Sequence, residues 1–239
     1  MASGEPLTLV VNGRSLTIEA CDGVQPTVFS LFLANMLRPG EGMKLAVDAG
    51  AGGGILSVVL ALGGVEKIIA IERSPDACEL LSRNAKANGV ADQVQIICDD
   101  ISNCGWITEA DLVVSNPPTV PEREGSPSFV GGSGSDGLGF LSELLRMSAI
   151  WLRSGGSTQI VLSSLVNEGR FVSLCALADI VARPRGMIFV PIREFYYDSY
   201  TREDIARFLA TGALLRESLS SAHPNEILTF YECFRRQAV

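Results

Sequence analysis

Val47-Asp-Ala-Gly-Ala-Gly-Gly-Gly54 is the stretch of sequence that decides the fold. The short apolar run 45–48 predicts a buried strand that leads into the glycines, and residues 55–62 predict a helix after them. Glycines at such a junction let the backbone turn sharply and let a ligand lie against bare peptide groups. Ligands of open α/β sheets bind outside the carboxyl ends of the strands, so this loop is the first candidate for a ligand site.

Strands and helices alternate along the chain after this loop. Further strands are predicted at 67–71, 94–98, 111–115 and 158–162, and further helices at 75–88 and 140–152. The pattern weakens after residue 163, where helices are predicted at 166–181 and 201–211 and strands at 187–192 and 227–234. Apolar strands alternating with helices indicate one Rossmann-like α/β domain with a mostly parallel seven-stranded sheet and helices on both faces.

The N-terminal residues follow a different pattern. Asn12-Gly13 separates two short strand-like runs within residues 5–20, and Asn-Gly favours the tight turn of a β-hairpin. We therefore expect a β-hairpin extension over residues 1–25 and the main domain over residues 26–239.

Composition narrows the possible classes of protein. The 239 residues are 47% hydrophobic but contain no apolar run long enough to span a bilayer, and the N-terminus lacks the pattern of a secretory signal. The chain has one histidine and six cysteines without CxxC spacing, so no metal site is expected. We expect a cytoplasmic protein without membrane contact, either a monomer or a homodimer. The net charge of −8 disfavours extended nucleic-acid contact.

Two acidic residues flank the predicted ligand loop. Asp48 directly precedes the glycines, where a carboxylate could receive a ligand's ammonium group but would repel a pyrophosphate. Glu72 ends the next strand, where it could accept hydrogen bonds from both hydroxyls of a ribose. The two acids suit a cationic amino-acid nucleoside better than NAD, and a dinucleotide-dependent oxidoreductase is kept as an alternative.

These motifs resemble those of the class I methyltransferases. Asp-x-Gly-x-Gly-x-Gly, the acid at the next strand end and Asp99-Asp100 after the third strand come in the order of that family. The resemblance implies an enzyme with S-adenosyl-L-methionine as cofactor and S-adenosyl-L-homocysteine as product. The residues that it implies for the cofactor site are Asp48, Gly50, Gly52, Gly54, Glu72, Asp100 or Asp99 for the adenine amine, Ile101 and Asn116.

Asn116-Pro117-Pro118 ends the fourth predicted strand, at the same sheet edge as the glycine loop. Two prolines fix φ and remove two backbone donors, and Pro117 forces Asn116 into an extended conformation. The result is a rigid corner with two acceptors, the Asn116 side-chain oxygen and the Pro117 carbonyl. Two fixed acceptors suit a substrate with two N–H donors on one planar nitrogen, so these three residues are the predicted catalytic set.

The corner is similar to the Asn-Pro-Pro-Tyr/Phe signature of amino-methyltransferases, above all the release-factor glutamine methyltransferases. Gly134-Ser-Asp136-Gly137-Leu138 also resembles a segment of that family, and the resemblance covers about residues 25–165. This chain departs from the family at Thr119, which stands in place of an aromatic residue that stacks on the acceptor group. The candidate substrate-binding residues are Thr27, Phe29, Thr119, Phe129, Tyr196, Tyr197 and Tyr200.

The sequence therefore predicts a methyltransferase that methylates an amide or amine nitrogen of a small molecule or of a peptide or protein side chain. A methyltransferase acting on an RNA or DNA base amine is the alternative. A non-catalytic protein that binds S-adenosylmethionine is also kept open.

Overall fold

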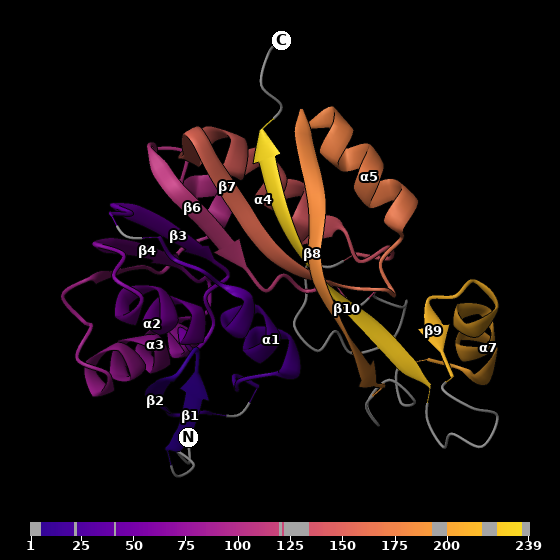
Figure 1. The fold of residues 1–239 in the computed structure, drawn as a ribbon, viewed down its shortest axis with the longest axis horizontal. Helices are drawn as coiled ribbons and strands as arrows, with labels where there is room; N and C mark the ends of the chain where they lie inside the picture. The colour runs from indigo at the N-terminus through magenta and orange to yellow at the C-terminus, as the bar shows by residue number, and fades with distance from the viewer. Residues whose placement is uncertain are drawn as a thin grey trace.

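A mostly parallel β-sheet with helices on both faces makes up the centre of the molecule (Figure 1). The computed structural model describes residues 6–21, 23–40, 42–119, 121, 134–192, 200–216 and 224–235. The predicted Rossmann-like fold, with its N-terminal hairpin, is confirmed by this arrangement.

The sheet runs in the order β5-β4-β3-β6-β7-β10-β8, and the short strand β9 pairs with β10. The strands are β3 (Leu45–Ala49), β4 (Lys67–Ile71), β5 (Val94–Ile97), β6 (Ala110–Ser115), β7 (Leu152–Ser163), β8 (Ile180–Pro191), β9 (Leu214–Leu215) and β10 (Asn225–Arg235). Strand β10 is antiparallel to β7 and β8, whereas the pairs from β5 to β7 are parallel. The seven predicted strands are thus present, and β9 adds an eighth that the sequence did not predict.

Two hydrophobic cores cover the two faces of the sheet. The helices are α1 (Val28–Met36), α2 (Ile55–Leu62), α3 (Pro75–Ala87), the single 3-10 turn η1 (Ile101–Asn103), α4 (Gly139–Trp151), α5 (Glu168–Leu177) and α7 (Arg202–Ala210). Helices α1, α2 and α3 pack on one face together with the hairpin, and α4 and α5 pack on the other (Figure 1). None of the helices in these described ranges is long and apolar enough to cross a membrane.

The predicted hairpin consists of β1 (Leu7–Val11) and β2 (Arg14–Ile18). Asn12 and Gly13 both have positive φ, 50° and 75°, as the tight turn between twisted strands requires. Val11, Leu16 and Ile18 are buried in the same core as α1 and α2, so the hairpin packs directly on the main domain.

The C-terminal third differs most from the prediction. The helix expected over 166–181 ends at Leu177, and Asp179 takes a left-handed conformation with φ 55° that reverses the chain. Ile180 and Val181 then begin β8, where they pair with the end of β10. The β-branched residues at this boundary therefore follow the long-range strand pairing and not the local helical pattern.

The strand order determines where a ligand can bind. Strands β3 and β6 are neighbours, but the chain leaves β3 toward β4 on one side and reaches β6 only after β5 at the sheet edge. Such a switch in strand order opens a crevice outside the carboxyl ends of the two strands. The glycine loop follows β3 and Asn116 follows β6, so both border this crevice.

Candidate active site

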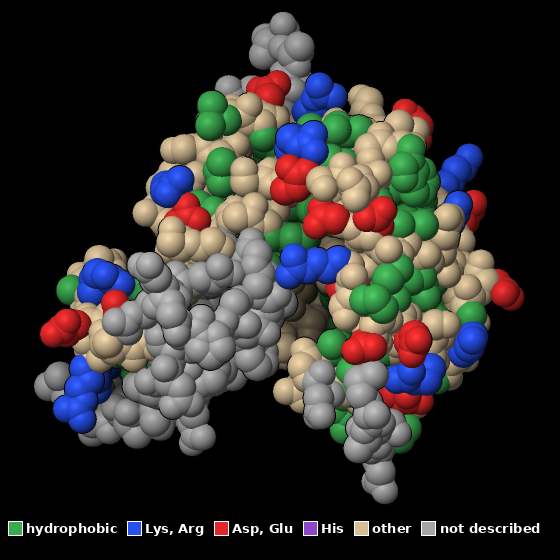
Figure 2. Space-filling model, turned by 180° about the vertical axis from the view of Figure 1, so that it is seen from behind, with side chains coloured by type: hydrophobic (Ala, Val, Ile, Leu, Met, Phe, Trp, Pro, Cys, Tyr) green, Lys and Arg blue, Asp and Glu red, His purple; other side chains and the backbone are tan. Residues whose placement is uncertain are grey.

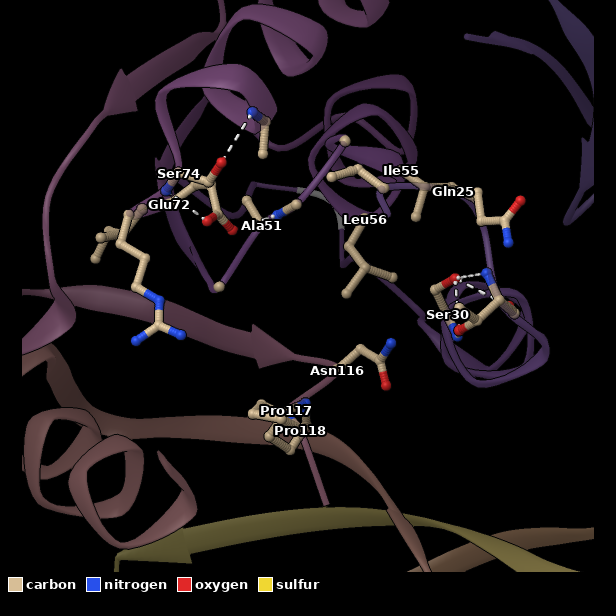
Figure 3. Close-up of a pocket in the computed structure, with 18 of the residues that line it drawn as sticks. Gln25, Ser30, Ala51, Ile55, Leu56, Glu72, Ser74, Asn116, Pro117 and Pro118 are labelled. Atoms are coloured by element: carbon tan, nitrogen blue, oxygen red, sulfur yellow. Dashed lines mark hydrogen bonds between the residues drawn. The ribbon is translucent and has the colours of Figure 1, made fainter. Parts of the chain in front are cut away.

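A cavity of about 490 Å³ lies at this edge of the sheet, which is a size typical of small-molecule sites. Its walls come from the residues after β2, the start of α1, the glycine loop, the ends of β4, β5 and β6, and α4. Figure 3 shows Glu72 and Ser74 at one end of this space and Asn116 and Ser30 at the other. The cavity therefore has two ends with different polar groups.

The glycine loop is tied to the end of β4 and presents bare backbone to the cavity. The amides of Gly50 and Ala51 both donate to the carbonyl of Ile71, at 2.9 and 3.0 Å. Gly50 and Gly52 have φ of 70° and 53° and line the cavity. A Cβ at Gly52 would meet only Val24, at 4.0 Å, so the position faces open space where a ligand can approach the peptide group.

Gly54 requires a correction, because it does not line the cavity. It precedes α2 with φ 83°, and a Cβ there would lie 2.6 Å from Cγ of Leu81 on α3. Gly54 thus allows α2 and α3 to pack closely. Gly53, which the sequence analysis did not single out, lies on the cavity wall instead.

Asp48 also requires a correction. Its side chain is completely buried and is absent from the cavity wall, so the wall does not present the carboxylate that we expected to meet a ligand's ammonium group. Its Oδ2 accepts a 2.6 Å hydrogen bond from Oγ of Ser57, while Oδ1 has no partner within the described structure. Burial raises the pKa of Asp48 to about 7, against the lowering effect of hydrogen bonds from Ser57.

Glu72 lies where the sequence predicted a ribose-binding acid. Its Oε2 accepts from the amide of Gly52 and its Oε1 from the amide of Ser74, both at 2.9 Å (Figure 3). These two bonds fix the carboxylate on the cavity wall. Each oxygen keeps further acceptor capacity, so the group can still bind two hydroxyls.

Asp99, Asp100 and Ile101 all line the cavity beyond β5. Oδ1 of Asp100 accepts from the amide and the hydroxyl of Ser102, and these bonds lower the pKa of Asp100. Oδ1 of Asp99 accepts from the Asp100 amide and from the Asn103 side chain. Both carboxylates are therefore held at the η1 turn, and the geometry does not choose between them as the partner of an adenine amine.

The Asn-Pro-Pro corner lies across the cavity from α1. Ser115 Oγ donates to the carbonyl of Ala49 at 2.7 Å, which ties the end of β6 to the start of the glycine loop. Asn116, Pro117 and Pro118 line the cavity, and the Asn116 side chain points toward α1, where Ser30 lies (Figure 3). The structure thus brings the three predicted catalytic residues to the same cavity as Gly50, Gly52 and Glu72.

The predicted substrate-binding residues are divided between different places. Thr27, Phe29 and Thr119 line the cavity, although the Thr27 hydroxyl caps α1 by accepting from the Ser30 amide. Tyr200 requires a correction, because it is absent from the wall and packs in a third core while its hydroxyl donates to the Pro121 carbonyl. Phe129, Tyr196 and Tyr197 lie outside the described residues, as does His223.

Sequence reasoning missed several cavity residues. Phe140 on α4 packs against Gly50, 3.3 Å from where a Cβ would stand, and its ring borders the cavity. No local pattern predicts this contact, since it arises only when α4 crosses the glycine loop. Gln25, Ser30 and Arg73 also line the cavity. Arg73 could have been found from its position directly after Glu72.

The wall fits S-adenosylmethionine better than a dinucleotide. Among the described residues of the chain, the charged ones on this wall are four acids and one base: Glu19, Glu72, Asp99, Asp100 and Arg73. This balance favours a ligand with hydroxyls and positive charge over a pyrophosphate. The nucleoside part of S-adenosylmethionine would lie against the glycine loop, Glu72 and the acids beyond β5. This leaves the other end of the cavity, at Asn116, for a methyl acceptor.

Fold and site together define a class I methyltransferase architecture. The family model for the methyltransferase small domain matches residues 28–173, and the chain belongs to this family of S-adenosylmethionine-dependent methyltransferases. The chain is 28% identical over 195 residues to the release factor glutamine methyltransferase of Mycolicibacterium smegmatis, covering 71% of this chain and 68% of that protein. It is 35% identical over 106 residues to the ribosomal protein L11 methyltransferase of Aeromonas hydrophila, covering 44% of this chain and 36% of that one.

Solved structures share the fold at lower identity. The T. thermophilus 16S rRNA N2 methyltransferase RsmC, solved with AdoMet and guanosine, has a TM-score of 0.57 and 20% identity, covering 81% of this chain and 49% of its own. A geranyl diphosphate methyltransferase solved with SAM has a TM-score of 0.55 and 15% identity, covering 84% and 82%. These two proteins act on chemically different acceptors, so the shared fold does not identify the acceptor.

Proposed function

We propose that this protein transfers a methyl group from S-adenosylmethionine to an amide or amine nitrogen that is held by the Asn116 corner. The observation that carries the proposal is the position of Asn116-Pro117-Pro118 in one cavity with the glycine loop and Glu72. The similarity to the two protein methyltransferases favours a nitrogen on a peptide or protein side chain as the acceptor.

The chain's own residues would act by positioning. When bound, the cofactor supplies a sulfonium methyl group. Asn116 Oδ1 and the Pro117 carbonyl would each accept one N–H of the acceptor nitrogen and so orient its lone pair along the line of transfer. Neither oxygen is a base at neutral pH, so after transfer the extra proton leaves the nitrogen for water.

The contributions of the remaining cavity residues follow from their places on the wall. Gly50, Gly52 and Glu72 would hold the nucleoside, with Asp99 or Asp100 at the base. Phe29 and Phe140 offer aromatic surfaces in the cavity, while Thr119 provides none. We also infer that residues 1–25 are an extension of the domain over 26–239, because the hairpin packs on α1 and α2 and its end contributes Ile18 and Glu19 to the wall.

Replacing Asn116 separates transfer from cofactor binding. Asn116→Ala should lower methyl transfer by roughly 100-fold or more, because one of two orienting acceptors is lost. Its affinity for S-adenosylhomocysteine should stay within a fewfold by calorimetry. The control is Asn167→Ala, which removes an asparagine that caps α5 outside the cavity and should leave turnover unchanged. Full activity of Asn116→Ala would contradict the proposed nitrogen clamp.

The acceptor class can be assigned by labelled-methyl transfer to separated fractions of a lysate. We expect label in the protein or peptide fraction, on an amide or amine nitrogen. Transfer to RNA or DNA with tight, saturable binding at physiological salt would instead support a nucleic-acid methyltransferase. On the described part of the face that Figure 2 shows, basic and acidic side chains are interspersed and form no extended basic patch of the kind that binds a phosphate backbone.

A further inference from the structure

The Asn-Pro-Pro corner and the residues after it have few backbone N–H groups with which to form hydrogen bonds. Pro117, Pro118 and Pro121 have no backbone N–H, so this segment cannot be fixed by donors of its own at three positions. Its support must come from side-chain donors of the segment itself, from neighbouring groups that donate to its carbonyls, or from groups that pack against it. The structure shows three such supports, at the front, middle and back of the segment.

The front and middle supports come from the sheet and from the loop before α4. Ser115 donates to the Ala49 carbonyl at 2.7 Å and fixes the end of β6. The Thr119 carbonyl lies so close to Gly137 that a Cβ at this glycine would collide with it. Thr119 itself is buried, and Gly137 has φ 75°, so only glycine allows this approach without strain.

The back support is Tyr200, which lies 79 residues away in the sequence. Its hydroxyl donates to the Pro121 carbonyl over 2.8 Å, a good distance for an O–H···O bond. Burial raises the pKa of Tyr200, so the hydroxyl stays protonated and remains a donor at neutral pH.

Tyr200 is itself fixed by a separate small core. The side chain is 8% exposed and packs with Leu165, Ile192 and Leu214, and Phe208 of α7 meets its ring edge-on at 5.2 Å. This core is attached to the sheet, because Ser164 Oγ donates to the Ala213 carbonyl at 2.6 Å and accepts from the Ile227 amide at 2.9 Å. The Tyr200 hydroxyl is therefore carried by a ring that packs in a core attached to the sheet.

We propose that Tyr200 is a positioning residue that fixes the acceptor-binding corner through the Pro121 carbonyl, and that the α7–β9 unit serves as its support. The role of the corner rests on the proposed function above. A loosened corner leaves the nucleoside end of the cavity intact, since Gly52 and Glu72 are held by bonds of their own. Tyr200 should thus affect the orientation of the acceptor without affecting the cofactor.

Tyr200→Phe removes the hydroxyl and keeps the ring. We expect kcat to fall roughly tenfold, the effect of one lost hydrogen bond at a site where orientation matters. The Kd for S-adenosylhomocysteine should stay within twofold. Amide hydrogen exchange at Asn116 and Thr119, followed by NMR, should accelerate several-fold. Tyr231→Phe is the matched control, because this partly buried tyrosine packs on Phe171 of α5 and should change none of these quantities.

The two readouts separate this proposal from the proposed function. Accelerated exchange at Asn116 and Thr119 in Tyr200→Phe supports the positioning role even if no methyl transfer is found in the parent protein, which would refute the proposed function alone. Unchanged exchange at both amides, or a fall in melting temperature with unchanged kcat, would overturn the positioning role and leave the proposed function standing.

Discussion

Burial changes which groups the carboxylate of Asp48 can contact. The sequence places it next to the ligand loop, but the completed sheet encloses it, and its carboxylate contacts Ser57 on α2 and not the cavity. The sequence cannot distinguish these outcomes, because the residue before a glycine loop can point to either side of the strand end. The chemistry of Asp48 is consequently that of a buried acid.

The burial of Asp48 predicts a specific dependence of stability on pH. Its pKa is about 7 in the folded protein and near 4 when unfolded, so between these values only the unfolded chain loses the proton. The contribution of Asp48 to the free energy of unfolding should therefore fall as pH rises from about 4 to about 7. In Asp48→Asn this contribution is absent, and the stability of the variant relative to the parent should rise by up to about 4 kcal/mol over that range. Denaturant titrations at several pH values measure the difference, and a difference that does not vary with pH would contradict the prediction.

Two side chains at the C-terminal half of α3 form the backbone hydrogen bonds that a neighbouring strand would otherwise form. Asn84 and Asn88 lie one helical turn apart, and each bonds to the N–H and the C=O of one residue of the segment that includes β2. Asn88 pairs with Thr17 in this way and Asn84 pairs with Glu19, while Asn84 also donates to the Gly53 carbonyl at 2.8 Å. The two amides satisfy the backbone of an otherwise unpaired strand edge.

Asn84 links the hairpin to the glycine loop, so its removal should affect both. Asn84→Ala should destabilise the protein by about 2–3 kcal/mol, because buried backbone groups lose their partners. It should also weaken S-adenosylhomocysteine binding several-fold, since Gly53 and Glu19 line the cavity. Asn88→Ala, the control, should lower stability but keep the affinity. Equal affinities of the two variants by calorimetry would refute the link.

Elements with strong local signals were predicted well. Helix α3 begins at Pro75, directly after the N-cap Ser74, as expected, and strand β4 spans the predicted residues. The predicted start of β8, at residue 187, was wrong. The strand begins at Ile180, because the pairing of this residue with β10 overrides its local helical pattern. The short strand β9 was missed for the same reason, since two residues carry too little local signal to identify a strand.

At the scale of the whole molecule, ligand binding should stabilise the folded state selectively. S-adenosylhomocysteine at about 100 times its Kd should add roughly 2.7 kcal/mol to the free energy of unfolding and raise the melting temperature. NADH should give no shift, because the described part of the cavity wall carries four acids and one base, which disfavours a pyrophosphate. A thermal shift assay with both ligands decides this, and stabilisation by NADH alone would overturn the cofactor assignment.

The sequence by itself determined the class of fold, because apolar strands that alternate with helices can only be buried in a layered α/β arrangement. It also determined the glycine loop and the corner at Asn116, because these depend on backbone conformations that glycine and proline impose locally. Only the tertiary structure decided which residues share the cavity. It removed Asp48 and Gly54 from the wall, added Phe140, and placed Tyr200 outside the cavity with its hydroxyl on the Pro121 carbonyl. The physical reason is that burial and contact depend on strand order and helix packing, which bring together residues as far apart as Pro121 and Tyr200.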